Sequence, residues 1–276
     1  KSYFYLSFSN KNLFRFKSHT KITILLSQLP NTLIIGKVLD HQEKCVSTNS
    51  YAKRLIAKSK PLEGTVVITD NQTEGRGQFG NSWVSEAGQN ITLSVIVYPK
   101  LSADRQFYLS KVASLACVKA LKSITNLDFE IKWPNDIYYG NLKVGGLLIE
   151  NQLAGDQISN SVIGIGINLN QEAFDNLPQA TSITQLVRYV LNRKKCTAIL
   201  LEHLDAAYLM LHQGRLGDID SEYHECLKAY QSDFKFKENR VAKTGFLKGV
   251  NTQGQLEVVE DGKERVFNFK EIEWVL

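Results

Sequence analysis

The residues best suited to chemistry lie in FEIKWPNDIYYGNLKVGGLLIE, residues 129–150. Lys132 stands at the end of a predicted strand, directly before the turn that Pro134 indicates. A lysine held at a strand end is a fixed positive charge, which can neutralise a reacting carboxylate or an α-phosphate. The alternative is an ordinary turn, in which Asn135 and Asp136 only satisfy their own backbone. The residue types leave both interpretations open.

A glycine-rich loop, TEGRGQFGNSW at residues 73–83, is the second candidate. Gly75, Gly77 and Gly80 remove side chains where backbone could approach a ligand, and consecutive N–H groups in such a turn can bind an anion. Arg76 adds a planar cation suited to carboxylate or phosphate. A flexible surface hairpin would have the same composition. The loop is neither a Walker A loop nor a dinucleotide-binding fingerprint, because no G-K-[ST] follows and it leads toward a strand.

Strands and helices that could position these groups follow from the hydrophobic pattern. Buried or alternating apolar runs predict strands, and longer amphipathic runs predict helices. Successive strands after the long helix indicate hairpins, so we expect an α+β fold with antiparallel pairing rather than a Rossmann domain. The predicted strands are 32–39, 64–72, 90–99, 129–133, 142–151 and 161–170, and the predicted helices are 47–60, 103–125, 197–213 and 221–230.

The pattern changes near residue 233. From there to residue 276, short alternating runs are separated by N-T-Q-G and E-D-G-K, which are hairpin signals. About five short strands fit, the size of a small SH3-like barrel. We therefore expect a main domain over 33–232 and an SH3-like domain over 233–276.

Residues 1–32 form a basic, aromatic and Ser/Thr-rich leader that we expect to lie outside the core. A transit peptide, a secretory signal and an over-extended reading frame were the alternatives, of which the last fits best. The first 36 residues contain five Lys or Arg and no acid, so they account for the whole net charge of +5. The body is neutral, and composition gives no argument for nucleic-acid binding.

The remaining composition narrows the class of protein. The chain has no apolar run long enough to span a membrane, and we expect no membrane association. Its four cysteines and five histidines show no metal-ligand spacing, so we expect no structural metal and a reducing compartment, the cytoplasm.

Six motifs together resemble the biotin protein ligases, over about residues 33–276. They are STN at 47–49, NQTEGRG at 71–77, the loop-ending Trp83, KWPNDI at 132–137, GIGINLN at 164–170 and LPQATSI at 177–183. The resemblance implies a class II synthetase-like mixed sheet with helices and a C-terminal SH3-like barrel.

That resemblance also implies an activity. Biotin would attack the α-phosphate of ATP, with Mg²⁺, to give biotinyl-5′-adenylate and pyrophosphate. A lysine of a biotin carboxyl carrier domain would then attack the adenylate. Charge stabilisation would carry most of this catalysis. The resemblance implies the family's carrier domain as the partner and a monomer or homodimer as the assembly. An N-terminal DNA-binding winged helix has no counterpart here, so we expect no nucleic-acid partner.

Site residues carry over motif by motif. The resemblance gives Lys132 and Arg76 catalytic roles, Lys132 touching both biotin carboxylate and α-phosphate. It implies a biotin site made of Ser47, Thr48, Asn49, Gln72, Gly75, Arg76, Gly77, Gln78 and Lys132. STN also precedes a predicted helix, so it can act as an N-cap as well.

The implied ATP site comprises Trp83, Asn135, Lys143, Gly145, Gly166 and Asn168, with Gly146 and Gly164 beside them. Trp83 could equally be a core residue, Lys143 a solvated strand end, and the GIGINLN run a tightly packed central strand. These alternatives stay open on the sequence.

One departure concerns charge. Many members of the family carry basic residues where this chain has Gln78 and Asn81. Glutamine can donate to a phosphate but cannot neutralise it. Either another cation compensates, as we expect, or the adenylate is held less firmly and reaches nearby lysines. The competing functions are a lipoate or octanoate ligase, which would be expected to lack KWPND, and a non-catalytic biotin-binding protein.

Overall fold

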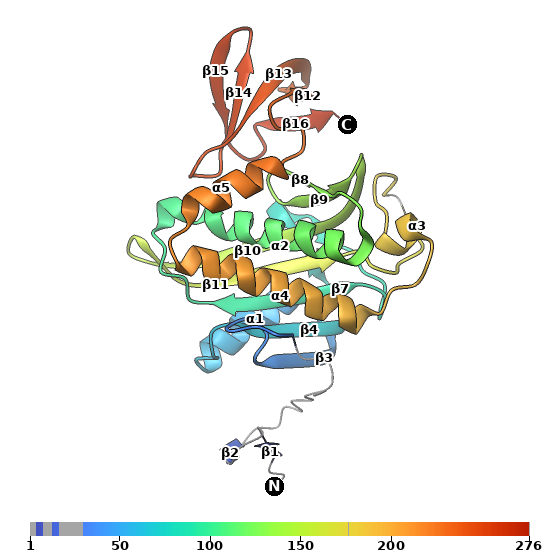
Figure 1. Ribbon diagram of the computed structural model, residues 1–276, viewed down its shortest axis with the longest axis vertical. Helices are drawn as coiled ribbons and strands as arrows, with labels where there is room; N and C mark the ends of the chain where they lie inside the picture. Colours follow the sequence, from blue (N-terminus) through green and yellow to red (C-terminus); the bar gives the residue numbers. More distant parts are fainter. Residues whose placement is uncertain (1–3, 8–12, 17–29, 176, 276) are drawn as a thin grey trace.

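A computed structural model describes residues 4–7, 13–16, 30–175 and 177–275 of the 276-residue chain (Figure 1). The first strands, β1 (Phe4–Ser7) and β2 (Leu13–Phe16), form an antiparallel pair. The leader expected over 1–32 otherwise lies mostly outside the described residues, so its role stays a prediction.

The centre of the molecule is a seven-stranded mixed sheet. Only its first pair, β3 with β4, is parallel; all other neighbours are antiparallel. The predicted α+β class with antiparallel hairpins is therefore confirmed. In spatial order the strands are β3 (Leu39–Cys45), β4 (Thr65–Gln72), β7 (Ile91–Val97), β11 (Gln157–Ile167), β10 (Leu142–Ala154), β9 (Asp136–Tyr139) and β8 (Glu130–Lys132).

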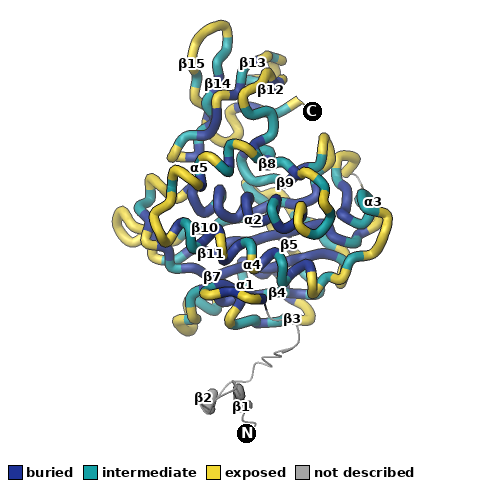
Figure 2. The backbone as a smooth tube through the Cα atoms, in the orientation of Figure 1, coloured by how far each residue is buried: buried dark blue, intermediate teal, exposed yellow. Residues whose placement is uncertain are grey.

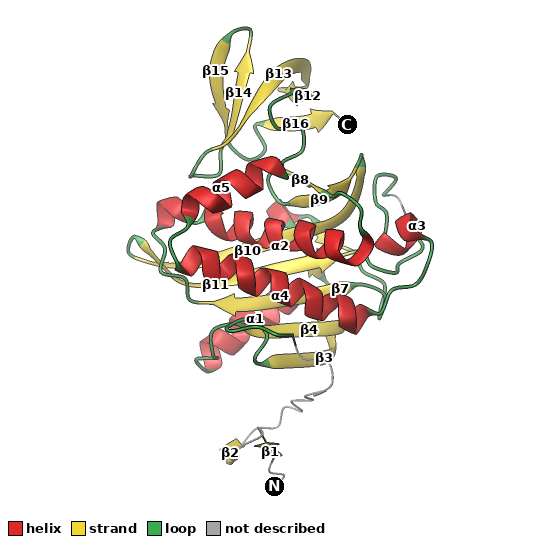
Figure 3. Cartoon of the chain, in the orientation of Figure 1, coloured by secondary structure: helices red, strands yellow, loops and turns green. Residues whose placement is uncertain are grey.

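Helices cover both faces of this sheet (Figure 3). On one face lie α2 (Phe107–Thr125), α4 (Arg193–His212) and α5 (Leu216–Glu225), while α1 (Thr48–Lys58) lies on the other. All seven residues of β7 are buried, as expected of a strand covered on both sides. The buried strands and α2 form the continuous dark core in Figure 2.

Smaller elements complete the main body. The glycine-rich loop forms a short hairpin around a 3-10 turn, and another short helix follows the loop after β11. They are β5 (Gly75–Arg76), η2 (Gln78–Gly80), β6 (Ser82–Trp83), η3 (Ala103–Arg105) and α3 (Ile183–Val187).

The first predicted strand, 32–39, was wrong in position, because β3 begins only at Leu39. The carboxylate of Asp205 on α4 accepts the backbone N–H groups of Leu33, Ile34 and Ile35 at 2.7–2.8 Å. These groups therefore bond to a side chain and do not form a β-ladder. Ile35 is fully buried, which explains the apolar pattern without a strand.

The C-terminal segment forms a separate antiparallel sheet, and its five predicted strands are confirmed. They are β12 (Asp233–Glu238), β13 (Val241–Val250), β14 (Leu256–Glu260), β15 (Lys263–Phe267) and β16 (Ile272–Val275), in the order β15-β14-β13-β12-β16. Within the described residues no pairing joins β15 to β16, so a closed barrel is not formed. The division at residue 233 stays a prediction, although β12 begins there.

Contacts at the base of this sheet join it to the main body. The indole N–H of Trp133 donates to the Gly254 carbonyl at 2.8 Å. The buried Lys111 of α2 lies 2.6 Å from Asp220 Oδ1 on α5 and 3.3 Å from the Val250 carbonyl. These contacts fix the C-terminal sheet beside the end of the central sheet where β8 and β9 lie (Figure 1).

Candidate functional site

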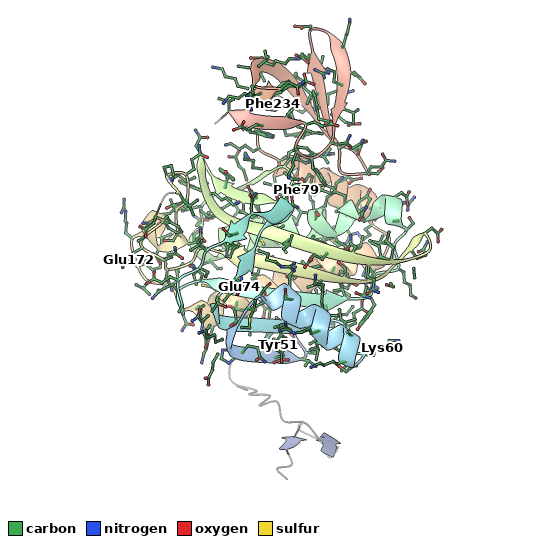
Figure 4. All side chains as sticks on the ribbon, turned by 180° about the vertical axis from the view of Figure 1, so that it is seen from behind. Tyr51, Lys60, Glu74, Phe79, Glu172 and Phe234 are labelled. Carbon is green, nitrogen blue, oxygen red and sulfur yellow. The ribbon has the colours of Figure 1, made fainter. Side chains whose placement is uncertain are left out.

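A cavity of about 540 Å³ opens on the α1 face of the central sheet, a typical volume for a small-molecule site. Its wall combines the N-terminus of α1, the glycine-rich loop, the strand ends at Lys132 and Gly166, and the C-terminal segment around Trp274. Figure 4 shows this face, with Glu74 and Phe79 marking the loop between α1 and the C-terminal sheet.

The α1 end of the cavity is a network of neutral polar groups. Ser47 is the N-cap, and its side chain accepts a hydrogen bond from the Ser50 N–H. Thr48 donates its backbone N–H to Gln72 Oε1 at 2.8 Å. Ser94 Oγ lies 2.6 Å from Asn49 Oδ1. Because these side chains hold one another, they form a preorganised surface of donors and acceptors for an uncharged polar ligand.

Lys132 supplies the deepest positive charge of the wall. Its Nζ lies 5.4 Å from the ring centroid of Tyr138 and 5.9 Å from that of Trp274. Burial lowers its pKa below that of an ordinary lysine, and the charge of Lys143 acts in the same direction, against the opposing effect of Asp136. Within the described residues Lys132 makes no ion pair, so it is a desolvated cation available to an anion.

Arg76 is already paired. Its Nη2 lies 2.9 Å from Glu150 Oε2, and Asn49 Nδ2 and Lys53 Nζ also donate to this carboxylate. Burial alone would raise the pKa of Glu150, but the hydrogen bonds from Lys53 and Asn49 keep it below its ordinary value. A ligand carboxylate would thus have to compete with Glu150 for Arg76.

A second ion pair lies on the opposite side of the cavity. Lys143 Nζ is 2.6 Å from Asp136 Oδ1 and 5.8 Å from the centroid of Trp83. Asn135 donates its Nδ2 to the Leu147 carbonyl at 2.6 Å, and so fixes the turn before β9 to β10. Asp136 therefore does more than satisfy its own turn, because it sets the position of Lys143.

The glycines make room for side chains of this chain. A Cβ on Gly166 would lie 2.5 Å from Cε2 of Trp83, and one on Gly164 would lie 2.3 Å from Asn49 Oδ1. A Cβ on Gly75 would lie 2.2 Å from the Trp83 carbonyl. The two strand glycines thus let Trp83 and Asn49 lie flat on β11, and the loop glycine lets β5 pair with β6.

The structure brings twelve predicted site residues together in the cavity wall and leaves three behind it. Gly75, Gly145 and Asn168 do not line the cavity. Asn168 is buried and donates its Nδ2 to the Thr181 carbonyl at 3.1 Å, while Gly145 packs against Ile167. The twelve lining residues are Ser47, Thr48, Asn49, Gln72, Arg76, Gly77, Gln78, Trp83, Lys132, Asn135, Lys143 and Gly166.

Sequence reasoning missed the part of the wall that comes from distant segments. Gln179 lies in the loop before α3, inside the LPQATSI motif but without an assigned role, while Glu273 and Trp274 belong to β16 and Lys270 to the turn before it. The indole Nε1 atoms of Trp83 and Trp274 are buried without a hydrogen-bond partner. In the C-terminal segment, only the tryptophan of EIEWVL, a large aromatic residue with a polar N–H, could have drawn attention.

Within the described residues no group of three or more His, Cys, Asp or Glu side chains could hold a metal ion. The described helices also include none with the length and apolar character needed to cross a membrane.

A mixed sheet covered by helices, with an anion-receptive cavity next to a small antiparallel sheet, defines the class of fold. Residues 43–168, a little under half of the chain, match the model of the biotin/lipoate A/B protein ligase family.

Relatives and solved structures agree with the match to this family model. The chain is 36% identical over 159 residues to the bifunctional ligase/repressor BirA of Bacillus spizizenii, covering 56% of this chain and 48% of that protein. It is 31% identical over 172 residues to the biotin–[acetyl-CoA-carboxylase] ligase of Mycobacterium tuberculosis, covering 61% and 63%. The match thus spans about half the length of the first relative.

Among solved structures, biotin protein ligase from Aquifex aeolicus in complex with biotin and ATP matches with a TM-score of 0.71. Its identity is 25%, over 86% of this chain and 98% of that one. Biotin protein ligase from Leishmania major in complex with biotinyl-5-AMP matches with a TM-score of 0.54 and 24% identity, covering 83% and 98%. The mixed sheet with its adjoining C-terminal sheet is the biotin ligase fold.

Proposed function

We propose that this chain activates biotin with ATP to biotinyl-5′-adenylate and transfers the biotin to a lysine of a biotin carboxyl carrier domain. The observation that carries the proposal is Lys132, a half-buried cation that makes no ion pair within the described residues, in a cavity whose other end is neutral and polar. The similar ligases were solved in complex with biotin and ATP and with biotinyl-5-AMP, which supports the choice of substrates.

We assign a different part of the substrate to each end of the cavity. The uncharged polar network at Ser47, Thr48 and Asn49 would hold the ureido ring of biotin, whose N–H and C=O groups match neutral partners. The biotin carboxylate would then lie toward Lys132. One cation between the carboxylate and the α-phosphate reduces their mutual repulsion as the new O–P bond forms and pyrophosphate leaves.

On the nucleotide side, Trp83 would offer its ring face to the adenine, and Lys143 would act from its pair with Asp136. Asn168 would act indirectly, because its amide fixes the loop that carries Thr181. Gly75 and Gly145 likewise shape the backbone behind the cavity.

Magnesium would come with ATP as the MgATP substrate. The wall holds two carboxylates, Asp136 and Glu273, and Asp136 is already paired with Lys143. This donor set fits an ion that keeps phosphate and water ligands, as Mg²⁺ prefers. Bound there, Mg²⁺ would neutralise phosphate charge.

The acceptor follows from the named relatives, one of which is a ligase for acetyl-CoA carboxylase. We infer a carrier domain of a biotin-dependent carboxylase as the partner. The scattered cysteines favour the cytoplasm as the place of reaction. A monomer or homodimer, without a nucleic-acid partner, stays the predicted assembly.

The test is biotin-dependent exchange of pyrophosphate into ATP, followed by transfer to a carrier domain. Lys132→Ala should reduce exchange by about 10²- to 10³-fold, the typical loss of one preorganised stabiliser. Lys58→Ala removes the same charge from the exposed end of α1 and should leave exchange unchanged.

Lipoate and octanoate, offered in parallel, should support no exchange. Exchange with lipoate in place of biotin would assign the chain to the other ligases of the family. A folded protein that binds biotin but catalyses no exchange would make it a binding protein.

A further inference from the structure

The cavity wall holds four cationic side chains, and their partners divide them into two pairs. Arg76 is bound to Glu150 at 2.9 Å, and Lys143 to Asp136 at 2.6 Å. In the part of the chain that the structure describes, the other two, Lys132 and Lys270, make no ion pair with an acid. No acid pairs directly with either ammonium group there, so they are the cations best able to bind phosphate.

Lys270 reaches the cavity from the turn between β15 and β16. The nearby acid Glu271 does not pair with it, because its carboxylate accepts the Asn268 N–H at 2.7 Å and the Asn268 side-chain amide at 3.1 Å. This pairing closes the turn on itself and leaves the ammonium group of Lys270 directed elsewhere.

The ammonium group instead lies on the glycine-rich loop. Lys270 Nζ is 4.2 Å from the ring centroid of Phe79, within the range of a cation–π contact. The same ring meets Phe269 at a centroid distance of 6.4 Å. Figure 4 shows Phe79 where the loop approaches the C-terminal sheet. The loop and the turn thus hold each other at the rim.

Both contact residues have an uncommon backbone. Phe79 has a φ of 59° and Lys270 a φ of 69°, in the left-handed region that non-glycine residues rarely adopt. Phe79 also remains 52% exposed, so burial does not explain its conformation. Two such residues in mutual contact at a cavity indicate a functional arrangement.

We propose that Lys270 binds the outer phosphates of ATP and the pyrophosphate that leaves, and that Phe79 positions it. This rests on the proposed ligase function. In that reaction a biotin oxygen bonds to the α-phosphorus, the bond from that phosphorus to the bridging oxygen breaks, and its electron pair leaves with pyrophosphate. The half-buried Lys132 suits the reacting phosphate, while the exposed Lys270 suits the group that departs to solvent.

This assignment also accounts for the composition of the loop. Gln78 and Asn81 line the cavity, and their neutral amides can donate hydrogen bonds to a phosphate but cannot neutralise its charge. Lys270 brings the missing charge from a segment almost two hundred residues further along the chain. The position of Lys270 at the cavity therefore depends on the docking of the C-terminal sheet against the main body.

The test compares Lys270→Ala, Lys270→Arg and Lys263→Ala in biotin-dependent exchange, with calorimetric binding of ATP and AMP. Lys263 is exposed on β15, outside the cavity, and its loss changes the net charge equally. Lys270→Ala should raise the KM for ATP and for pyrophosphate about tenfold, the usual effect of losing a hydrogen bond to a charged group. The KM for biotin and the affinity for AMP should stay the same. Lys270→Arg should restore most of the loss.

Each result has one meaning. If the unmodified protein shows no biotin-dependent exchange, the ligase proposal fails before Lys270 is tested. If exchange occurs and Lys270→Ala behaves like Lys263→Ala toward ATP and pyrophosphate, Lys270 does not bind phosphate. A parallel loss of biotin affinity in Lys270→Ala would instead make the Lys270–Phe79 contact a support for the whole loop, and the phosphate assignment would be wrong.

Discussion

Replacing Gly166 by alanine tests whether a glycine stands at this position of β11 to accommodate Trp83. The new Cβ would lie 2.5 Å from Cε2, 2.6 Å from Cζ2 and 2.8 Å from Nε1 of the Trp83 ring. Carbon atoms in contact lie about 3.5–4.0 Å apart, so the ring must retreat by about 1 Å. Strain of this kind in a packed region typically costs about 1–3 kcal/mol.

Two measurements follow from that displacement. Urea unfolding should show the lost stability, and the melting temperature should fall by about 2–4 °C per kcal/mol for a domain of this size. In the exchange assay the KM for ATP should rise, because a shift of about 1 Å in a positioning group can cost up to about 10²-fold. Gly217→Ala is the control: its Cβ meets nothing within 4 Å, so stability should change by less than about 1 kcal/mol.

A double mutant isolates the cause. In a Trp83→Leu background the ring is absent, so adding Gly166→Ala should cost little further stability, and the two changes should be non-additive. If Gly166→Ala costs as much without the ring as with it, the contact is not the reason for glycine at this position.

Two further predictions concern the half-buried Lys132 and the buried Lys111. The pKa of Lys132 is lowered mainly by burial, so its charge disappears at a lower pH than that of a free lysine. As the pH rises, kcat/KM for ATP should therefore decline early. Lys132→Arg should abolish that decline in a pH profile. Lys111 is 1% exposed and pairs with Asp220. Lys111→Ala should lower the free energy of unfolding measured in urea. The loss should stay below the roughly 3–5 kcal/mol of a fully buried pair, because Asp220 is 29% exposed. A loss below about 0.5 kcal/mol would show that the pair contributes nothing.

Local patterns predicted what depends on neighbours in sequence. The helix after Ser47 formed as expected because its cap and apolar face lie within one short segment. Lys132 and the loop could be selected for the same reason, since fixed strand ends and glycine turns are encoded locally. The strand predicted over 32–39 failed because Asp205, on a distant helix, takes its N–H groups. That competition has no local signal.

In the cavity, too, local sequence could not predict the contacts that come from distant segments. Gly166 and Asn168 were both assigned to the ATP site through the resemblance. Gly166 lines the cavity but also makes room for the Trp83 ring, whereas Asn168 lies behind the wall and donates its amide to the Thr181 carbonyl. Conversely, Trp274 and Lys270 reach the cavity only through the docking of the C-terminal sheet. A residue type suggests a chemistry, but its tertiary neighbours decide whether that chemistry is directed to a ligand.

Arg76 illustrates the consequence for mechanism. Its residue type and loop position favour binding of a substrate carboxylate, but Glu150 already occupies its guanidinium group. Exchanging one carboxylate for another gains little net energy, because the desolvation and Coulomb terms largely cancel. Lys132 has no such partner to lose, so the same ligand charge gains the full interaction there. In the proposed mechanism the tasks of the cations therefore follow from which of them are already paired. Arg76 would hold the wall through Glu150, Lys143 would act on the nucleotide from its pair with Asp136, and Lys132 would keep its charge for the substrate.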